Sequence, residues 1–154
     1  MSKAFTKEDT QPDEQPPKPL RSVLPEGSQN YVTPDGAKRM KAELESLIAR
    51  RRPDERIREL TRILDSVVVL GPPTEDLDIV RFGATVSVRS LPNGETVRYR
   101  IVGVDETDIA RGHISWVSPI AMALLSAAIG DRVRAVLPSG EKELEILDVS
   151  YETD

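Results

Sequence analysis

The sequence predicts an α+β fold, in which a short antiparallel helical hairpin precedes an antiparallel β-sheet domain with one short helix. Two observations predict this order. Between residues 33 and 67, apolar residues recur at spacings of three and four, which is typical of amphipathic helices. From residue 84 onward, short runs alternate between apolar and polar residues and are separated by turns that contain glycine, which is typical of β-strands.

Composition limits the chemistry that the chain can carry out. Its 154 residues suffice for one ordinary domain or two small ones, and they include no cysteine and a single histidine, His113. Disulfides and thiolate metal sites are thereby excluded, and we expect no metal, no cofactor and a surface position for His113. No apolar run approaches the roughly 20 residues of a membrane helix, and no apolar signal segment follows the first charges. We therefore expect a cytoplasmic protein without membrane contact.

The net charge of −5 is distributed unevenly along the chain. Residues 1–28 carry a charge of −1, residues 29–66 carry +2, and residues 67–154 carry −6. Nucleic-acid phosphates would repel the acidic last segment, which argues against autonomous DNA binding. A basic protein surface is the partner that this charge favours.

Residues 1–28 are expected to form a disordered tail. They contain five prolines among charged and amide residues, and few apolar side chains. Such a segment cannot bury enough apolar surface to offset the entropy lost on ordering. Order is predicted to begin near Tyr31.

Residues 29–70 are predicted to form the helical hairpin. Thr33 has the features of an N-cap, Pro34 suits the first helical position, and Pro53 marks the start of a second helix. The apolar seam of the first helix consists of Ala37, Met40, Leu44 and Leu47. The seam of the second consists of Ile57, Leu60, Leu64 and Val67. Each helix has about 16 residues, so the arm should be roughly 25 Å long.

Residues 71–78, which are rich in proline and acidic residues, are expected to be a linker, and residues 79–154 to form the sheet domain. A strand that begins at Ala84 turns at residues 92–94 and returns as the second strand of a hairpin. A later helix starts with Ser118 as its N-cap and is predicted to close near Gly130.

The last strand contains an irregularity. Leu144 and Ile146 share one face, whereas Leu147, Val149 and Tyr151 resume the alternation one residue out of step. This slip predicts a β-bulge.

Several motifs, taken in order, resemble the GreA/GreB family of transcription elongation factors. The opening run, Asn30-Tyr31-Val32-Thr33-Pro34-Asp35-Gly36-Ala37, resembles the beginning of the family's hairpin. Phe82-Gly83-Ala84-Thr85-Val86 and Tyr99-Arg100-Ile101-Val102-Gly103 resemble two strands of its C-terminal domain. The block Ser118-Pro119-Ile120-Ala121 carries the most specific part of the likeness, which extends over residues 30–151.

The resemblance implies a coiled-coil hairpin followed by a C-terminal domain of FKBP-like fold. In this family the C-terminal domain binds the rim of the secondary channel of RNA polymerase, and the hairpin enters the channel. Acidic residues at the hairpin tip help to hold a second Mg²⁺, and the polymerase itself then cleaves backtracked RNA. The implied partner is thus RNA polymerase, with nucleic acid only in indirect proximity, and the chain is expected to be a monomer and not an enzyme.

The expected polymerase-binding residues lie in the C-terminal domain. We expect the central contact at Ser118, Pro119 and Ile120. The surrounding acidic residues are Asp105, Glu106 and Asp108, which otherwise would form only a solvated loop.

The hairpin tip departs from the family. The acidic block of the form Gly-Asp-Leu-Ser-Glu-Asn is absent, and the turn here is Arg50-Arg51-Arg52-Pro53-Asp54-Glu55-Arg56. Asp54 and Glu55 diverge by about 100° on a helix, so they are expected to complement the positive end of the second helix and not to chelate a metal. The arginines either contact phosphate or an acidic channel wall, or form a solvated turn. Stimulation of transcript cleavage is therefore not expected.

Two alternatives remain open at this stage. One is a regulator that resembles the short-armed Gre relative known as a nucleoside-diphosphate-kinase regulator. The other is a peptidyl-prolyl isomerase, because the implied fold is FKBP-like. Fold alone does not establish function, and a proline pocket requires aromatic lining, whereas aromatic residues make up only 4% of this chain.

Overall fold

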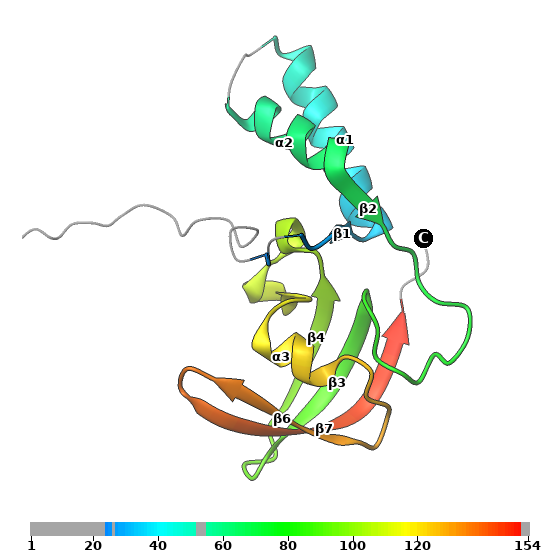
Figure 1. Ribbon diagram of the computed structural model, residues 1–154, viewed down its shortest axis with the longest axis vertical. Helices are drawn as coiled ribbons and strands as arrows, with labels where there is room; N and C mark the ends of the chain where they lie inside the picture. Colours follow the sequence, from blue (N-terminus) through cyan, green and yellow to red (C-terminus); the bar gives the residue numbers. More distant parts are fainter. Residues whose placement is uncertain (1–23, 26, 52–54, 152–154) are drawn as a thin grey trace, which may run out of the picture.

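The computed structural model describes residues 24–25, 27–51 and 55–151. In Figure 1 a helical arm projects from a domain built around a curved sheet, so the chain has two structural parts. The arm comprises β1 (Asn30–Val32), α1 (Pro34–Ala49), α2 (Glu55–Ser66) and β2 (Val67–Val69). The α+β architecture predicted from the sequence is confirmed.

The arm has its own small core. Thr33 caps α1 as predicted, since its hydroxyl accepts a hydrogen bond from the amide of Gly36 at 3.2 Å. The buried residues of this core are Val32, Ala37, Met40, Leu60 and Ile63. Burial of these side chains from both helices holds α1 and α2 together.

The base of the arm differs from the prediction. Val67, which was assigned to the second helical seam, begins β2, and Ile63 is buried in the arm core. β2 pairs in parallel with β1, so that Asn30 lies opposite Val67. The β-branched side chains of residues 67–69 favour an extended backbone, and β1 supplies the hydrogen-bonding partner.

The domain contains a five-stranded sheet with the order β5-β4-β3-β7-β6. Its strands are β3 (Ala84–Leu91), β4 (Thr96–Val102), β5 (His113–Ser115), β6 (Arg132–Leu137) and β7 (Gly140–Tyr151). The prediction of a purely antiparallel sheet was wrong at one edge, because β5 pairs in parallel with β4. Two 3₁₀ turns, η3 (Val104–Glu106) and η4 (Ile109–Arg111), carry the chain from the end of β4 back to the level of Arg100, where β5 begins.

Local features of the domain agree with the sequence patterns. The β3–β4 hairpin turns at residues 92–95, as predicted. The bulge in β7 is confirmed at Leu147, since the partners of Ser87 and Val88 are Asp148 and Ile146. The helix after Ser118 is shorter than predicted: α3 spans only Pro119–Leu124.

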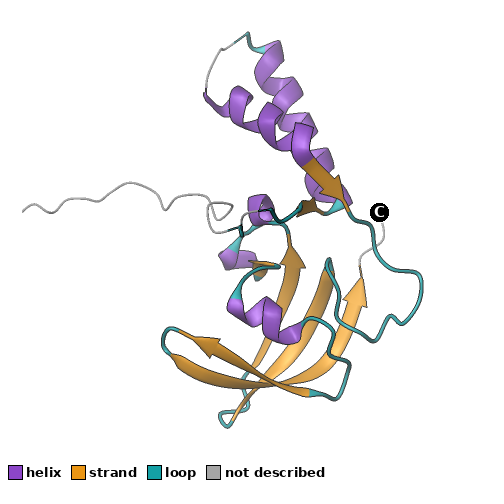
Figure 2. Cartoon of the chain, in the orientation of Figure 1, coloured by secondary structure: helices purple, strands orange, loops and turns teal. Residues whose placement is uncertain are grey.

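The helix α3 lies across one face of the sheet, as Figure 2 shows. Between them the sheet and α3 bury an apolar core that includes Val86, Ile101, Leu124, Leu144 and Ile146. This packing fixes the position of the loop that precedes α3. None of the described helices is long and apolar enough to cross a membrane.

Candidate functional site

The predicted polymerase-binding residues lie on two segments that flank β5, an edge strand of the sheet. Asp108 and His113 exchange backbone hydrogen bonds of 3.0 and 2.9 Å at the start of β5. At its other end the amide of Ser118 donates to the carbonyl of Ser115 at 2.9 Å. The strand therefore sets the spacing between the acidic loop and the start of α3.

Around β5 the structure exposes side chains of both polar and apolar character. The Asp108 side chain is 45% exposed, and its only ion-pair partner among the described residues is Arg111, at 3.5 Å. Next to it, Ile109 is 71% exposed. Pro119 is exposed, whereas Ile120 is half-buried and packs against the core. An exposed carboxylate beside exposed apolar groups is suited to contact with another protein.

Ser118 has a structural role in the same segment. Its hydroxyl accepts a hydrogen bond from the amide of Ala121 at 3.3 Å and so caps α3, as predicted. A substitution at Ser118 would therefore alter the helix that presents Pro119, whereas one at Asp108 would alter only an exposed charge.

Glu106 differs from the other predicted contact residues because it is buried. Its carboxylate accepts hydrogen bonds from the amide of Thr33 at 2.9 Å and from that of Gly103 at 2.8 Å. The Thr33 hydroxyl donates to the same carboxylate. Glu106 is therefore a contact between the domain and the start of the arm, and it is not available on the rim of a docking surface.

The environment of Glu106 opposes its ionisation. Burial raises the pKa of its carboxyl above the ordinary value, and the hydrogen bonds from Thr33 and Gly103 only partly compensate. The nearby negative charge of Asp35 acts in the same direction as burial. The charge of Glu106 is thus tolerated because its oxygens are hydrogen-bonded on both sides of the junction.

Two glycines allow this close approach. A Cβ on Gly36 would lie 1.9 Å from a carboxylate oxygen of Glu106, and one on Gly103 would lie 2.0 Å from the backbone carbonyl oxygen of Tyr31. Neither distance is sterically possible, so the junction requires glycine at both positions. The sequence motifs that contain them are thereby linked in space.

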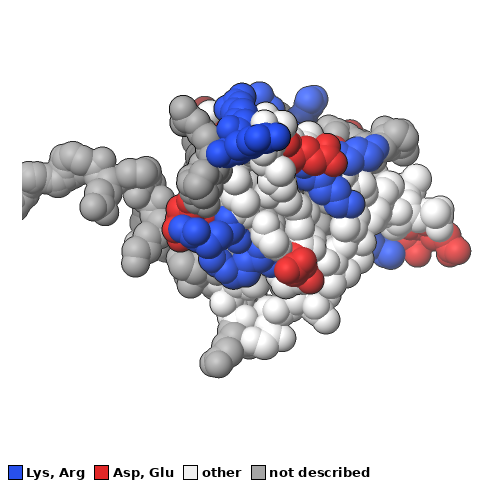
Figure 3. Space-filling view, turned by 90° about the horizontal axis from the view of Figure 1, so that it is seen from above, with Lys and Arg blue, Asp and Glu red and all other residues white. Residues whose placement is uncertain are grey.

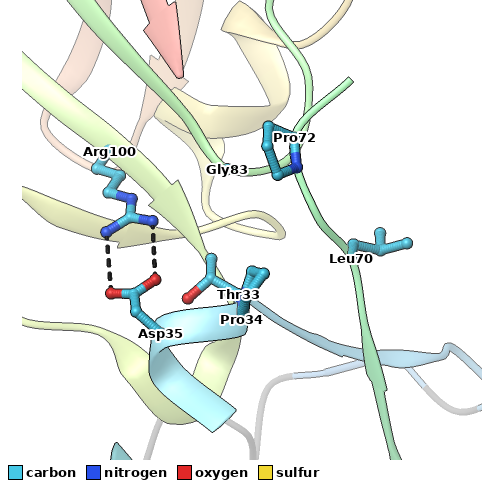
Figure 4. A pocket seen from close by; sticks show the side chains of 7 residues that line it. All are labelled: Thr33, Pro34, Asp35, Leu70, Pro72, Gly83 and Arg100. Carbon is cyan, nitrogen blue, oxygen red and sulfur yellow. Dashed lines mark hydrogen bonds and ion pairs between the residues drawn. The ribbon is translucent and has the colours of Figure 1, made fainter. Parts of the chain in front are cut away.

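A second polar contact at the junction is the ion pair between Asp35 and Arg100. Figure 4 shows the guanidinium of Arg100, on β4, facing the carboxylate of Asp35, in the first turn of α1. The two N–H···O distances are 3.1 and 3.4 Å. Burial raises the pKa of Asp35, but the hydrogen bonds and the charge of Arg100 outweigh it and hold this pKa well below the ordinary range.

Apolar contacts complete the junction. The ring of Tyr31, on β1, lies 5.8 Å from that of Phe82 and 5.1 Å from that of Trp116, the latter edge-to-face. The side-chain amide of Asn30 donates to Asp105 at 2.9 Å. The arm is thus attached to the domain by ring packing, hydrogen bonds and an ion pair, and its direction is defined relative to the β5 edge.

The described part of the hairpin tip is basic. Arg50 and Arg51 directly follow α1, are exposed and have no ion-pair partner among the residues that the structure describes. Arg51 adopts a left-handed backbone with φ of 56°, which ends the helix. Figure 3, which views the molecule from above, shows basic side chains gathered at this end with smaller acidic areas beside them.

The other charged residues near the tip are engaged within the arm. Arg56 donates to Glu43 across the helices at 2.8 and 3.0 Å, and to Glu59 at 3.0 Å. Glu55 lies in the first turn of α2 and pairs with Arg58 at 3.1 Å. Arg52, Pro53 and Asp54 lie outside the described residues. Among the described residues, no group of three or more potential metal ligands occurs.

The junction is a site that the sequence patterns do not predict. Glu106 and Thr33 are 73 positions apart, and Arg100 and Asp35 are 65 apart. No periodicity in a single sequence links such residues. The one sequence feature that could have indicated this contact is a pair of glycines. Gly36 lies in the motif at residues 30–37 and Gly103 in the motif at residues 99–103, and these two motifs are in contact in the structure.

Comparison with known proteins assigns the chain to a family. Residues 74–151 match the family described as "Transcription elongation factor, GreA/GreB, C-term". The chain is 36% identical over 156 residues to the transcription elongation factor GreB of Neisseria meningitidis serogroup B, a match that covers 80% of this chain and 95% of that protein. It is 40% identical over 98 residues to GreA of Helicobacter pylori strain G27, which covers 64% of this chain and 60% of that protein.

Solved structures of related proteins also match. A GreA/GreB factor from Nitrosomonas europaea aligns with a TM-score of 0.45 and 26% identity, covering 80% of this chain and 100% of the other. The crystal structure of GreA factor homolog 1 from Thermus thermophilus aligns with a TM-score of 0.43 and 19% identity, covering 79% and 99%. The sequence matches decide the assignment: this chain belongs to the GreA/GreB family of transcription elongation factors.

Proposed function

We propose that this protein is a transcription elongation regulator that docks on RNA polymerase at the secondary-channel rim and does not stimulate transcript cleavage. The C-terminal domain makes the contact, through Asp108, Ser118, Pro119 and Ile120. The observation that carries the proposal is a C-terminal sheet domain, matched to the Gre family over residues 74–151, that contacts a short arm with a basic end.

The length of the arm supports the second part of the proposal. α1 has 16 residues, which at about 1.5 Å per residue makes the arm about 24 Å long. The match to the Neisseria GreB extends over 156 positions but includes 80% of this 154-residue chain, or about 123 residues. About 33 aligned positions of the relative therefore have no counterpart here, a number that is compatible with a shortened hairpin.

The residues at the hairpin tip also argue against stimulation of transcript cleavage. Binding a second Mg²⁺ requires carboxylate oxygens at the end of the arm. The described residues there are Arg50 and Arg51, whose guanidinium groups carry no acceptor atom. Glu55, the nearest described acid, is paired with Arg58. The tip is thus suited to contact acidic groups and unsuited to hold a cation.

A peptidyl-prolyl isomerase is disfavoured by the same structure. A proline pocket requires several aromatic side chains, whereas the apolar pocket beside α3 is lined by a single aromatic residue, Trp116. A regulator of the nucleoside-diphosphate-kinase type would have the same short arm. A pull-down from a lysate with the tagged full chain distinguishes the two functions, because a polymerase-binding factor should recover RNA polymerase.

The docking surface can be tested with a charge reversal. We expect Asp108→Lys to weaken binding to core RNA polymerase about tenfold, because it places a like charge opposite a basic partner surface. Glu141→Lys makes the same charge change at an exposed position near the start of β7 and should leave binding intact. Binding of both variants and the parent is measured by titration at several salt concentrations, where the affinity of the parent should fall as salt rises.

Equal affinity of the parent and Asp108→Lys would remove Asp108 from the contact. Loss of binding in both variants alike would show that only net charge matters, and would contradict a defined docking site at the β5 edge.

A further inference from the structure

A polar cleft lies between the arm and the turn η3. It has a volume of about 140 Å³. Its walls are Met40, Arg56, Glu59 and Ile63 of the arm and Val104, Asp105 and Thr107 of the domain. The arm is therefore not packed tightly against η3 along this side, and the cleft leaves room for the arm to tilt toward the domain.

The ion pair between Asp35 and Arg100 lies on another face of the arm. Asp35 and Met40 are five residues apart on α1, so their side chains point in directions about 140° apart around the helix axis. The contact between Thr33 and Glu106 adjoins both sides. Thr33 lies two residues before Asp35, and Glu106 lies between two residues of the cleft wall, Asp105 and Thr107.

We propose that Asp35 and Arg100 are a positioning pair that holds the arm away from η3. Without this pair the arm tilts about the contact between Thr33 and Glu106 and closes the cleft. The pair is directional, because two nitrogens of one guanidinium donate to the two oxygens of one carboxylate, as Figure 4 shows. Its side chains are only 30% and 11% exposed, so solvent screens it less than the exposed pairs of the arm.

The position of the pair gives it a large effect on the end of the arm. Along the helix axis, Asp35 lies about 3 Å from Thr33, whereas Arg50 lies about 25 Å from Thr33. A movement of about 1 Å at Asp35 therefore becomes a movement of roughly 8 Å at Arg50. A single contact near the base thus suffices to set where the end of the arm lies.

The direction of the tilt has a consequence for docking, and this consequence rests on the proposed function. Thr107 forms part of the cleft wall, and Asp108 directly follows it in the chain. An arm closed onto η3 would lie over the side of the proposed docking surface that contains Asp108. The apparent affinity for polymerase would then fall in proportion to the fraction of molecules in which the arm stands clear of η3.

The test measures the distance between two spin labels by double electron–electron resonance. Because the chain has no cysteine, Ile48→Cys/Ile109→Cys places one label on the arm and one on η4, at side chains that are 56% and 71% exposed. In this labelled background Arg100→Gln should populate, in about half of the molecules, a distance shorter by at least about 5 Å. The matched control is Arg98→Gln, an exposed arginine on the same strand, which should give the distance of the labelled parent.

Two further variants show whether the ion pair itself is responsible. Asp35→Asn removes the pair from the other side and should give the same shortening as Arg100→Gln. Arg100→Lys keeps the positive charge and should keep most molecules at the parent distance. An unchanged or longer distance in both Arg100→Gln and Asp35→Asn would overturn the proposal. Equal shortening in Arg100→Lys and Arg100→Gln would overturn it as well, because it would assign the effect to the packing of Arg100. A merely stabilising pair would lower the melting temperature without changing the distance.

Binding to core RNA polymerase, measured with the unlabelled proteins, separates this proposal from the proposed function. We expect Arg100→Gln to bind about twofold more weakly than the parent and Arg98→Gln to bind as the parent does. If the distance shortens but no form binds polymerase, the positioning pair stands and the proposed function fails. If all forms bind equally and the distance is unchanged, the proposed function stands and the positioning pair is refuted.

Discussion

Single residues at the junction determine how the arm meets the domain. The carboxylate of Glu106 accepts hydrogen bonds from Thr33 and Gly103, which belong to different parts of the fold. Gly36 and Gly103 have no side chain, and this absence lets the two backbones approach each other. The junction therefore depends on the identity of a few residues, and conservative changes there should have measurable effects.

We expect Gly103→Ala to destabilise the protein by about 1–3 kcal/mol, because the new methyl group would collide with the backbone carbonyl of Tyr31. The free energy of unfolding, from chemical denaturation, measures the effect. Gly71→Ala is the matched control: no atom lies within 4 Å of its Cβ position, so a change of less than about 0.5 kcal/mol is expected. Equal stability of both variants would show that the junction tolerates separation.

Glu106 allows a sharper test, in which the carboxylate is compared with its amide and with alanine. Glu106→Ala leaves the buried donors of Thr33 and Gly103 without an acceptor, and we expect a loss of about 2–4 kcal/mol. Glu106→Gln keeps an oxygen for both amides, and its NH₂ group can donate to the Thr33 hydroxyl. The amide variant should therefore be far more stable than the alanine variant.

The pH dependence of the Glu106→Gln variant follows from the raised pKa of Glu106. Because the folded-state pKa lies above the ordinary value of 4.5, the contribution of Glu106 to stability is fully present below that pH. It decreases as the pH rises through the folded-state pKa. Relative to the parent, Glu106→Gln should gain stability as the pH is raised from about 4 to 7, as measured by melting temperature. A constant difference would contradict burial of an ionising carboxyl.

At the level of elements, the arm is held together mainly by side chains that α1 and α2 bury against each other. Leu60, on α2, is fully buried in this small core, together with Met40 on α1. Ion pairs between Arg56 and Glu43 lie at the surface, where such pairs contribute little. The stability of the arm should therefore depend on apolar contacts more than on its charges.

We expect Leu60→Ala to lower the free energy of unfolding by about 2–5 kcal/mol, since it creates a cavity in a core with few other members. Ile48→Ala is the control, because Ile48 lies on the same hairpin but is 56% exposed. Denaturation monitored by circular dichroism measures both. If the two variants lost equal stability, the arm would not be a packed unit.

The elements that the sequence predicted correctly depend on local signals. Thr33 and Ser118 cap helices because their hydroxyls reach amides three residues ahead, and the bulge at Leu147 follows from a one-residue slip in alternation. The elements that were missed depend on distant partners. Val67 forms a strand because β1 is there to pair with it, and Glu106 is buried because Thr33 lies over it. A single sequence contains no record of such pairings.

The whole molecule combines the proposed docking face with an arm that contacts the domain through several side chains. Ring packing between Tyr31 and Trp116, together with the pair of Asp35 and Arg100, connects β1 and α1 directly to the domain. Any contact made at the β5 edge therefore sets where Arg50 and Arg51 are placed. Under the proposed function, this connection would let a short arm act at a defined distance from the proposed docking site.

The effect on transcription is the prediction that depends on the molecule as a whole. This protein should not accelerate the cleavage of backtracked RNA, and in molar excess it should inhibit a full-length Gre factor. Under the proposed function the arm of about 24 Å does not reach far enough, and its described tip presents guanidinium groups where Mg²⁺ would require carboxylates. Competition is expected because the proposed docking face would still bind the rim while the described tip carries no acidic block.

The measurement uses stalled elongation complexes with Mg²⁺, to which this protein is added alone and then together with a full-length Gre factor. Arg50→Glu/Arg51→Glu is the matched variant, and it should compete as the parent does because the docking face is unchanged. Faster appearance of shortened transcripts with the parent alone would contradict the proposed function and point to Asp54 and Glu55 as acting acids. Absence of both cleavage and competition would contradict docking, since a protein that shares the rim must displace its relative when it is in excess.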